Sequence, residues 1–197
     1  MSKAERTKQQ ILEVTAPIFN KKGYDGTTLT DLCDATGLTK GALYGNFESK
    51  EELALFAFQF AARKVKSMVG SEVNAKSTYK DKLVAMLTFF STYVLNPPVP
   101  GGCPLLNTAI EADDHHTTLR SAVAVELEST IKFMSDLIDR GKKEGEFRSD
   151  IKSREYALLF FCAVEGALMF ARVSPTDEAM KVIVKQCKRI VDQISND

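Results

Sequence analysis

The sequence lacks a hydrophobic run long enough to cross a membrane. Its most apolar stretch, Tyr156–Ala171, has 16 residues and contains Glu165, whereas a transmembrane helix needs about 20 apolar residues. The amino-terminal segment Met1–Arg6 is polar, so it does not resemble a secretory signal peptide. We therefore expect no membrane partner and a cytoplasmic location.

Cysteine and histidine are also scarce, and neither is spaced like a set of metal ligands. The four cysteines are Cys33, Cys103, Cys162 and Cys187, which we expect to be reduced thiols. The adjacent pair His115 and His116 would point to different faces of a helix, which disfavours a shared metal ion. The sequence has no Ser/His/Asp or Cys/His arrangement at a recognisable spacing and no phosphate-binding loop. It therefore predicts no metal, no cofactor and no enzymatic activity.

The chain has no net charge, because 26 basic residues balance 26 acidic ones. Residues 1–66 hold 10 basic and 8 acidic side chains, which leaves 16 and 18 for residues 67–197. This asymmetry of +2 against −2 is weak, so net charge alone does not identify a nucleic-acid partner. A length of 197 residues is compatible with one or two compact units.

Strand-like alternation of polar and apolar residues is absent, and helical periodicity dominates. In the last helix, for example, one stripe at three-and-four spacing contains Ala179, Ile183, Cys187, Ile190 and Ile194. The sequence predicts an all-α protein with about nine helices. Their expected ranges are 4–22, 28–35, 39–45, 49–71, 77–95, 103–112, 116–143, 151–173 and 176–195.

Residues 27–47 read as two short helices separated by a tight turn at Gly37. We expect Leu29, Leu32 and Ala35 of the first helix to pack against Leu38, Ala42 and Leu43. This is the pattern of a helix-turn-helix unit, whose second helix enters a DNA major groove about 12 Å wide. We expect residues 1–50 to form this head, residues 49–71 to form a connecting helix, and residues 72–197 to form a second helical domain.

Several short motifs resemble the signature of the TetR family of transcriptional regulators. They are Thr39–Tyr44, Phe47, Ser49–Leu53, and the earlier pairs Gly23–Tyr24 and Thr28–Leu29. The resemblance is strong over residues 7–56. Many members have a histidine just before the phenylalanine, where this chain has Gly45–Asn46. A glycine there weakens the recognition helix by about 1 kcal/mol relative to alanine, so the base preference is expected to differ.

The resemblance implies that the head contacts DNA through one set of residues. They are Thr28, Thr39, Lys40, Gly41, Tyr44, Asn46 and Lys50. Thr28 (through its hydroxyl and backbone N–H), Tyr44 and Lys50 would bind phosphate groups. Thr39–Gly41 would lie at the groove end of the recognition helix, and Asn46 would contact a base or a phosphate. Phe47 is expected to pack inside the head.

By the same resemblance, the second domain binds an inducer and pairs with a second subunit through the helices at 151–173 and 176–195. The candidate ligand contacts are Phe90, Tyr93, Cys103, Phe133, Glu165 and Met169. Glu165 either pairs with a basic residue across the dimer, lies at an exposed helix edge, or contacts the ligand. Gly101–Asn107 resembles a Gly-Cys-Pro-Leu element of one branch of the family. There Cys103 is either a structural residue or a sensor of electrophiles, since a helix amino terminus favours the thiolate.

The sequence thus predicts a homodimeric repressor that binds a palindromic operator in double-stranded DNA. A small apolar or electrophilic effector would release it. One alternative is a ligand-independent or activating regulator. Another is a small-molecule or electrophile sensor with altered or lost DNA binding, which only the Gly45–Asn46 departure favours.

Overall fold

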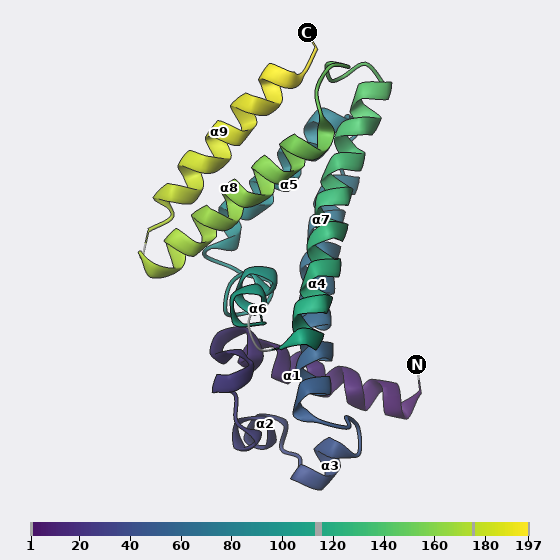
Figure 1. Ribbon diagram of the computed structural model, residues 1–197, viewed down its shortest axis with the longest axis vertical. Coiled ribbons are helices and arrows are strands. Elements are labelled where there is room, and N and C mark those ends of the chain that lie inside the picture. The colour runs from purple at the N-terminus through teal and green to yellow at the C-terminus, as the bar shows by residue number, and fades with distance from the viewer. Residues whose placement is uncertain (1, 113–115, 175, 197) are drawn as a thin grey trace. The chain divides into compact units, whose positions relative to one another are not determined.

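The computed structural model describes residues 2–112, 116–174 and 176–196, so His115 lies outside the described residues. In these ranges the chain forms nine α-helices (Figure 1). They are α1 (Lys3–Gly26), α2 (Leu29–Thr36), α3 (Lys40–Tyr44), α4 (Lys50–Asn74), α5 (Tyr79–Tyr93), α6 (Pro104–Ala112), α7 (Thr117–Lys143), α8 (Ser153–Val173) and α9 (Glu178–Ile194). The predicted all-α class is confirmed. The largest difference in a helix boundary is at α1, where Gly23 has φ 75° and interrupts the helix before a last turn.

The chain divides into two compact units. The first contains Met1–Val65 and Pro98–Val125, and the second contains Lys66–Pro97 and Glu126–Asp197. The first unit therefore combines the three amino-terminal helices with α6 and with parts of α4 and α7. The boundaries predicted at residues 50 and 72 divide the chain into consecutive segments. Each of the two units instead combines segments that are distant in the sequence.

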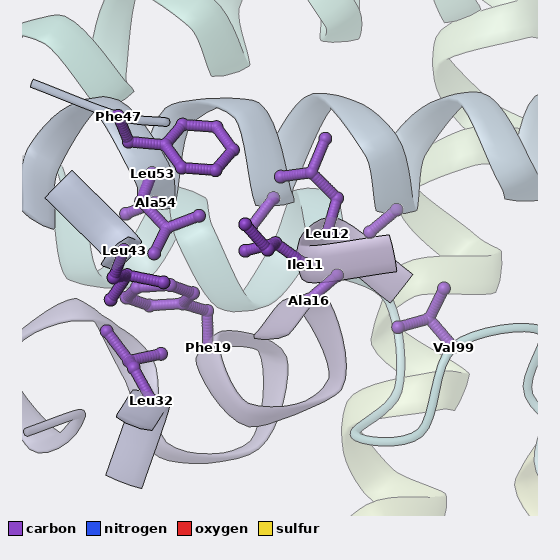
Figure 2. Packing of buried hydrophobic residues seen from close by; sticks show 12 residues of the cluster. Ile11, Leu12, Ala16, Phe19, Leu32, Leu43, Phe47, Leu53, Ala54 and Val99 are labelled. Carbon is purple, nitrogen blue, oxygen red and sulfur yellow. The ribbon is translucent and has the colours of Figure 1, made fainter. Parts of the chain in front are cut away.

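The core of the first unit is formed by apolar side chains from α1, α2, α3 and α4 (Figure 2). Leu32 on α2 and Leu43 on α3 are almost completely buried, as are Phe47 and Leu53. Burial of one such side chain stabilises a fold by about 1.5–3 kcal/mol. The prediction that Phe47 packs inside the head is confirmed, because only 2% of it is exposed.

Two small residues expected in this core are exposed. Ala35 and Ala42 both lie on the solvent side of their helices. On α2 the inward face is set by Leu29, Leu32 and Thr36, and Ala35 is about 100° away from the centre of that face on a helix of 3.6 residues per turn. Alanine is small and only weakly apolar, so its presence does not predict which face of a helix is buried.

The second unit is built around α5, α8 and α9, which pack against one another. The buried stripe of α9 is Met180, Val184, Cys187, Val191 and Ile194. It shares Cys187 and Ile194 with the predicted stripe, whose Ile183 and Ile190 are half-buried beside it. Backbone hydrogen bonds attach the end of α9 to the loop before α8, from Arg148 N to Ile194 O (2.9 Å) and from Asn196 N to Glu146 O (2.9 Å).

Candidate nucleic-acid interface

The amino terminus of α2 is fixed by reciprocal hydrogen bonds between Thr28 and Asp31. The backbone N–H of Asp31 donates to Thr28 Oγ1 (3.1 Å), and the backbone N–H of Thr28 donates to Asp31 Oδ2 (2.9 Å). The hydrogen bond from Lys22, 2.6 Å away, and those from Thr28 lower the pKa of Asp31 to about 2. The N–H of Thr28 is thus already used within the head, whereas its exposed hydroxyl can still donate a hydrogen bond to a phosphate.

The turn between α2 and α3 depends on a left-handed residue. Gly37 has φ 68° and ψ 13°, and its N–H donates to Cys33 O (2.9 Å). No atom lies within 4 Å of the position that a Cβ would occupy on Gly37. The requirement for glycine is therefore conformational rather than steric.

The helix α3 presents its first turn to solvent. Thr39 caps it, because Thr39 Oγ1 accepts a hydrogen bond from Ala42 N (3.2 Å). Thr39, Lys40 and Gly41 are all exposed, and Lys40 forms no hydrogen bond or ion pair with the described residues. A Cβ on Gly41 would meet nothing within 4 Å. This end of α3 offers an exposed positive charge at Lys40 and a backbone without a side chain at Gly41, which suit a groove in DNA.

The segment Gly45–Asn46 ends α3 without breaking the head. Gly45 keeps helical backbone angles, and its N–H donates to Gly41 O (2.9 Å). The side-chain amide of Asn46 donates to Ala42 O (2.9 Å). This bond satisfies a carbonyl group at the carboxyl end of α3, so the side-chain N–H that remains and the side-chain oxygen are the atoms of Asn46 available to DNA.

At the first residue of α4, the Nζ atom of Lys50 lies 4.3 Å from the centroid of the Tyr24 ring. Burial, followed by the negative charges of Glu51 and Asp25, raises the pKa of Tyr24, so this ring remains neutral. The cation–π contact holds a positive charge at the amino terminus of α4, where a phosphate also gains from the helix dipole. Lys50 and the nearby Tyr44 are half-buried.

The predicted DNA contacts thus come from three neighbouring places in the first unit: the start of α2, all of α3 with its cap, and the start of α4. All seven are exposed or half-buried. The carboxylate of Glu111 on α6 was missed by sequence reasoning. It accepts the backbone N–H groups of Tyr24 (2.6 Å) and Asp25 (2.9 Å) at the end of α1.

Gly23 makes this contact possible. A Cβ on Gly23 would lie within 3 Å of the Glu111 carboxylate, and its φ of 75° also favours glycine. In the sequence, Gly23–Tyr24 is only one of the motifs of the family resemblance, and nothing there indicates that Tyr24 has a partner 87 residues away.

A second contact joins α6 to α1 through two asparagines. The side-chain amide of Asn107 donates to Asn20 O and to Asn20 Oδ1, both at 2.9 Å, and Asn20 Nδ2 donates to Gly102 O (2.9 Å). Asn20 is buried, so these bonds satisfy polar groups that would otherwise be costly to bury. We name these contacts of Glu111 and Asn107 with α1 the α6 clamp.

The six candidate ligand contacts do not gather in one described cavity. Phe90 and Tyr93 on α5 are adjacent, with ring centroids 5.6 Å apart. Glu165 on α8 is half-buried, and Phe133 and Met169 are exposed. Cys103 belongs to the first unit, where it is buried at the start of α6. These residues stay predictions.

A small cavity in the first unit lies between α1, α4 and α6. Asn20, Tyr24, Thr108 and Glu111 contribute its polar lining. Its volume of about 20 Å³ has room for a water molecule and not for an organic effector. Among the described residues, no cluster of His, Cys, Asp and Glu could hold a metal ion.

The helix α8 has two apolar faces. One packs within the second unit through Phe160, Val164 and Leu168. The opposite face is exposed and includes Leu158, Leu159, Met169, Phe170 and Val173, each between 41% and 84% exposed. By length and hydropathy alone, α8 would be able to cross a membrane, with a third of the relevant window buried. Such an exposed apolar face is a candidate for an interaction site.

Two family descriptions match the chain. Residues 11–56 match "Bacterial regulatory proteins, tetR family", and residues 80–187 match "Tetracyclin repressor-like, C-terminal domain". The first match contains α2, α3 and the start of α4, and the second covers more than half of the chain.

Individual relatives agree with these matches. A crystal structure of a TetR-family transcriptional regulator from Cytophaga hutchinsonii is 39% identical and has a TM-score of 0.92, covering 100% of this chain and 98% of its own. The HTH-type transcriptional repressor DhaR of Mycobacterium sp. (strain GP1) is 22% identical over 96% of each chain. A cysteine mutant of the regulator CifR, solved with a 26-base-pair operator DNA, has the same fold, with 19% identity, a TM-score of 0.81 and coverage of 92% and 94%.

Proposed function

The chain belongs to the TetR family of transcriptional regulators, and we propose that it is a homodimeric repressor which a small molecule releases from a palindromic operator. It is a DNA-binding regulator with a helix-turn-helix head. The observation that carries the proposal is the exposed first turn of α3, where Lys40 forms no ion pair with the described residues. We expect a regulatory protein without catalytic activity.

In this proposal α3 enters the major groove with Thr39, Lys40 and Gly41 against the base edges. The hydroxyl groups of Thr28 and Tyr44 and the ammonium group of Lys50 bind phosphates on either side. Asn46 contributes only the part of its amide that does not cap α3. Phosphate contacts position the head, and the residues of α3 supply the sequence preference.

The dimer forms through α8 and α9. Exposed residues of α8 (Leu158, Leu159, Phe170 and Val173) lie opposite its buried stripe, so a second copy can cover them without disturbing the unit. We expect Ile183 and Ile190, which are half-buried on α9, to take part in the same contact. Pairing around a two-fold axis places the same surface of each subunit in the contact. It also removes the apolar surface from water, which favours a cytoplasmic dimer over a membrane protein.

Within the first unit, the α6 clamp connects α6 with the head. Glu111 and Asn107 attach α6 to α1 at two positions, and α1 packs on α2. An effector that shifts α6 would therefore move the end of α1, and with it α2. Phe90, Tyr93, Phe133, Glu165 and Met169 are the proposed contacts of an apolar effector.

An electrophilic effector would instead react with Cys103. Its thiol lies at the start of α6 in the Gly-Cys-Pro-Leu element, which we assign to one branch of the family. The sulfur is buried, so the reaction needs an opening of the preceding Gly101–Gly102 segment. Both glycines have positive φ values, 119° and 94°.

The test of this function is binding to the DNA upstream of the protein's own gene, followed by fluorescence anisotropy. The wild type should bind this DNA more tightly than a random duplex. Lys40→Ala should lose more affinity for the specific DNA than for random DNA, by about 1–3 kcal/mol. Lys76→Ala is the matched control, since Lys76 is exposed in the second unit. Equal affinity of the wild type for both duplexes would overturn the proposal.

A further inference from the structure

The helix α9 has three distinct faces. Met180, Val184 and Cys187 form its buried face, and Ile183 and Ile190 lie on one side of it. On the other side is a basic face, which contains Lys181, Lys185, Lys188 and Arg189. At 100° per residue, the centre of this basic face is about 165° away from the Ile183–Ile190 side. A partner that covers the isoleucines therefore leaves the basic face open to solvent.

The basic face borders a groove between α9 and α5. The groove has a volume of about 450 Å³, within the range of about 300–1,000 Å³ that small-molecule sites occupy. Its wall on α5 is Ser91, and its floor includes Val184, which is only 5% exposed. Four cations and one carboxylate, Asp192, line it. The groove is shallow and open to solvent, and all of its lining except Ser91 comes from α9.

The charges in the groove are not balanced. Lys181 pairs with Asp177 (2.9 Å), and Asp192 pairs with Lys80 outside the lining (2.9 Å). Among the described residues, Lys185, Lys188 and Arg189 have no carboxylate partner within 4 Å.

The spacing of the basic residues along α9 also brings like charges close together. Lys181, Lys185 and Arg189 follow one another at four-residue intervals, and like charges at this spacing destabilise a helix. A negative ligand in the groove would relieve that repulsion.

We propose that this groove binds a small polyanion with at least two phosphate groups. Lys181 and Lys188 are seven residues apart, which is about 10 Å along the helix axis, so the positive charges extend over a short phosphate chain rather than a single ion. Lysine binds phosphate as a point charge, and Arg189 adds a planar pair of donors. The hydroxyl proton of Ser91 is already donated to Thr88 O (2.6 Å), so Ser91 contributes shape and not a donor. The site shares no residue with the six candidate ligand contacts or with the DNA-binding head.

The test is isothermal titration of the full-length protein with tripolyphosphate and, separately, with ATP, at an ionic strength of about 0.15 M. One molecule should bind per chain with a Kd below about 1 mM. The double variant Lys185→Gln/Lys188→Gln should weaken binding at least about tenfold. The control is Lys76→Gln/Lys143→Gln, which removes the same charge from exposed positions elsewhere in the second unit.

Equal affinity for tripolyphosphate and ATP identifies the phosphate chain as the part that is bound. Tighter binding of ATP identifies a nucleotide. Either result supports the site. Thermal unfolding by circular dichroism verifies that both variants fold. Absence of binding at about 10 mM, or an equal loss in both double variants, would overturn the proposal, since affinity would then be absent or due to net charge alone.

Discussion

Replacing Glu111 with alanine removes the carboxylate that holds the end of α1. Two backbone N–H groups, those of Tyr24 and Asp25, then lose their acceptor. A hydrogen bond to a charged group contributes about 1.5–3 kcal/mol. The bond to Asp25 is exposed and water can replace it, whereas the bond to Tyr24 is partly buried. We therefore expect the free energy of unfolding to fall by about 2–3 kcal/mol, which is less than the sum of the two bonds.

The same change should reduce operator affinity, because the position of α2 depends on α1. If the variant destabilises the DNA-binding conformation of the head by about 1.4 kcal/mol, the complex with DNA becomes tenfold weaker. Urea denaturation measures the stability, and fluorescence anisotropy measures the affinity. Glu111→Gln keeps one acceptor oxygen and should lie between the wild type and the alanine variant.

Glu144→Gln is the control for these measurements, since Glu144 is exposed in the second unit and its side chain forms no hydrogen bond with the described residues. It should change neither quantity. If Glu111→Ala has the same free energy of unfolding and the same DNA affinity as the wild type, the α6 clamp does not position the head. The proposed coupling of α6 to α1 is then refuted.

Three further predictions test other parts of the molecule. The pKa of Asp31 is lowered from 3.8 to about 2 in the folded state, so its stabilising contribution is present above pH 3.8 and is lost as the pH falls through about 2. In Asp31→Asn, the free energy of unfolding measured in urea should therefore fall less steeply over that pH range. A pH profile equal to that of the wild type would refute this role of Asp31. Phe170→Glu places a charge in the proposed dimer contact, where Phe170 is exposed on the single chain, and should give monomers in sedimentation at micromolar concentration, whereas a dimer that persists would exclude this face. The buried thiol of Cys103 should react with iodoacetamide at least about tenfold more slowly than the exposed Cys162, and equal rates would mean that the Gly101–Gly102 segment opens freely.

The helices and the head could be predicted because their determinants are local. Thr28 with Asp31 forms a capping box within four residues, and Gly37 takes the left-handed conformation that a tight turn requires. The three-and-four spacing of leucines and phenylalanines located the helices to within a few residues. The exposed positions of Thr39–Gly41 follow from the same local pattern.

Contacts between distant segments could not be predicted in this way. The bonds from Glu111 to Tyr24 and Asp25 join residues 86 and 87 positions apart, and no local signal marks Glu111 among the acidic residues of the chain. The spacing of apolar residues on α9 did not show which of them the unit buries, because Met180, Val184 and Val191 lie beside Ile183 and Ile190 on the helix. Two neighbouring apolar stripes on one helix indicate that two different surfaces pack against it. Only the folded structure shows which stripe is buried within the unit.

Footprinting of the protein on the DNA upstream of its own gene tests the central claim most directly. A two-fold dimer with one α3 in each half-site should protect two symmetric half-sites on the same face of the duplex, with centres separated by about 10 base pairs or a multiple of that distance. Lys40→Ala should remove this protection at a protein concentration where Lys76→Ala retains it. A single protected segment without symmetry, or no protection at concentrations where the protein is folded, would contradict the account.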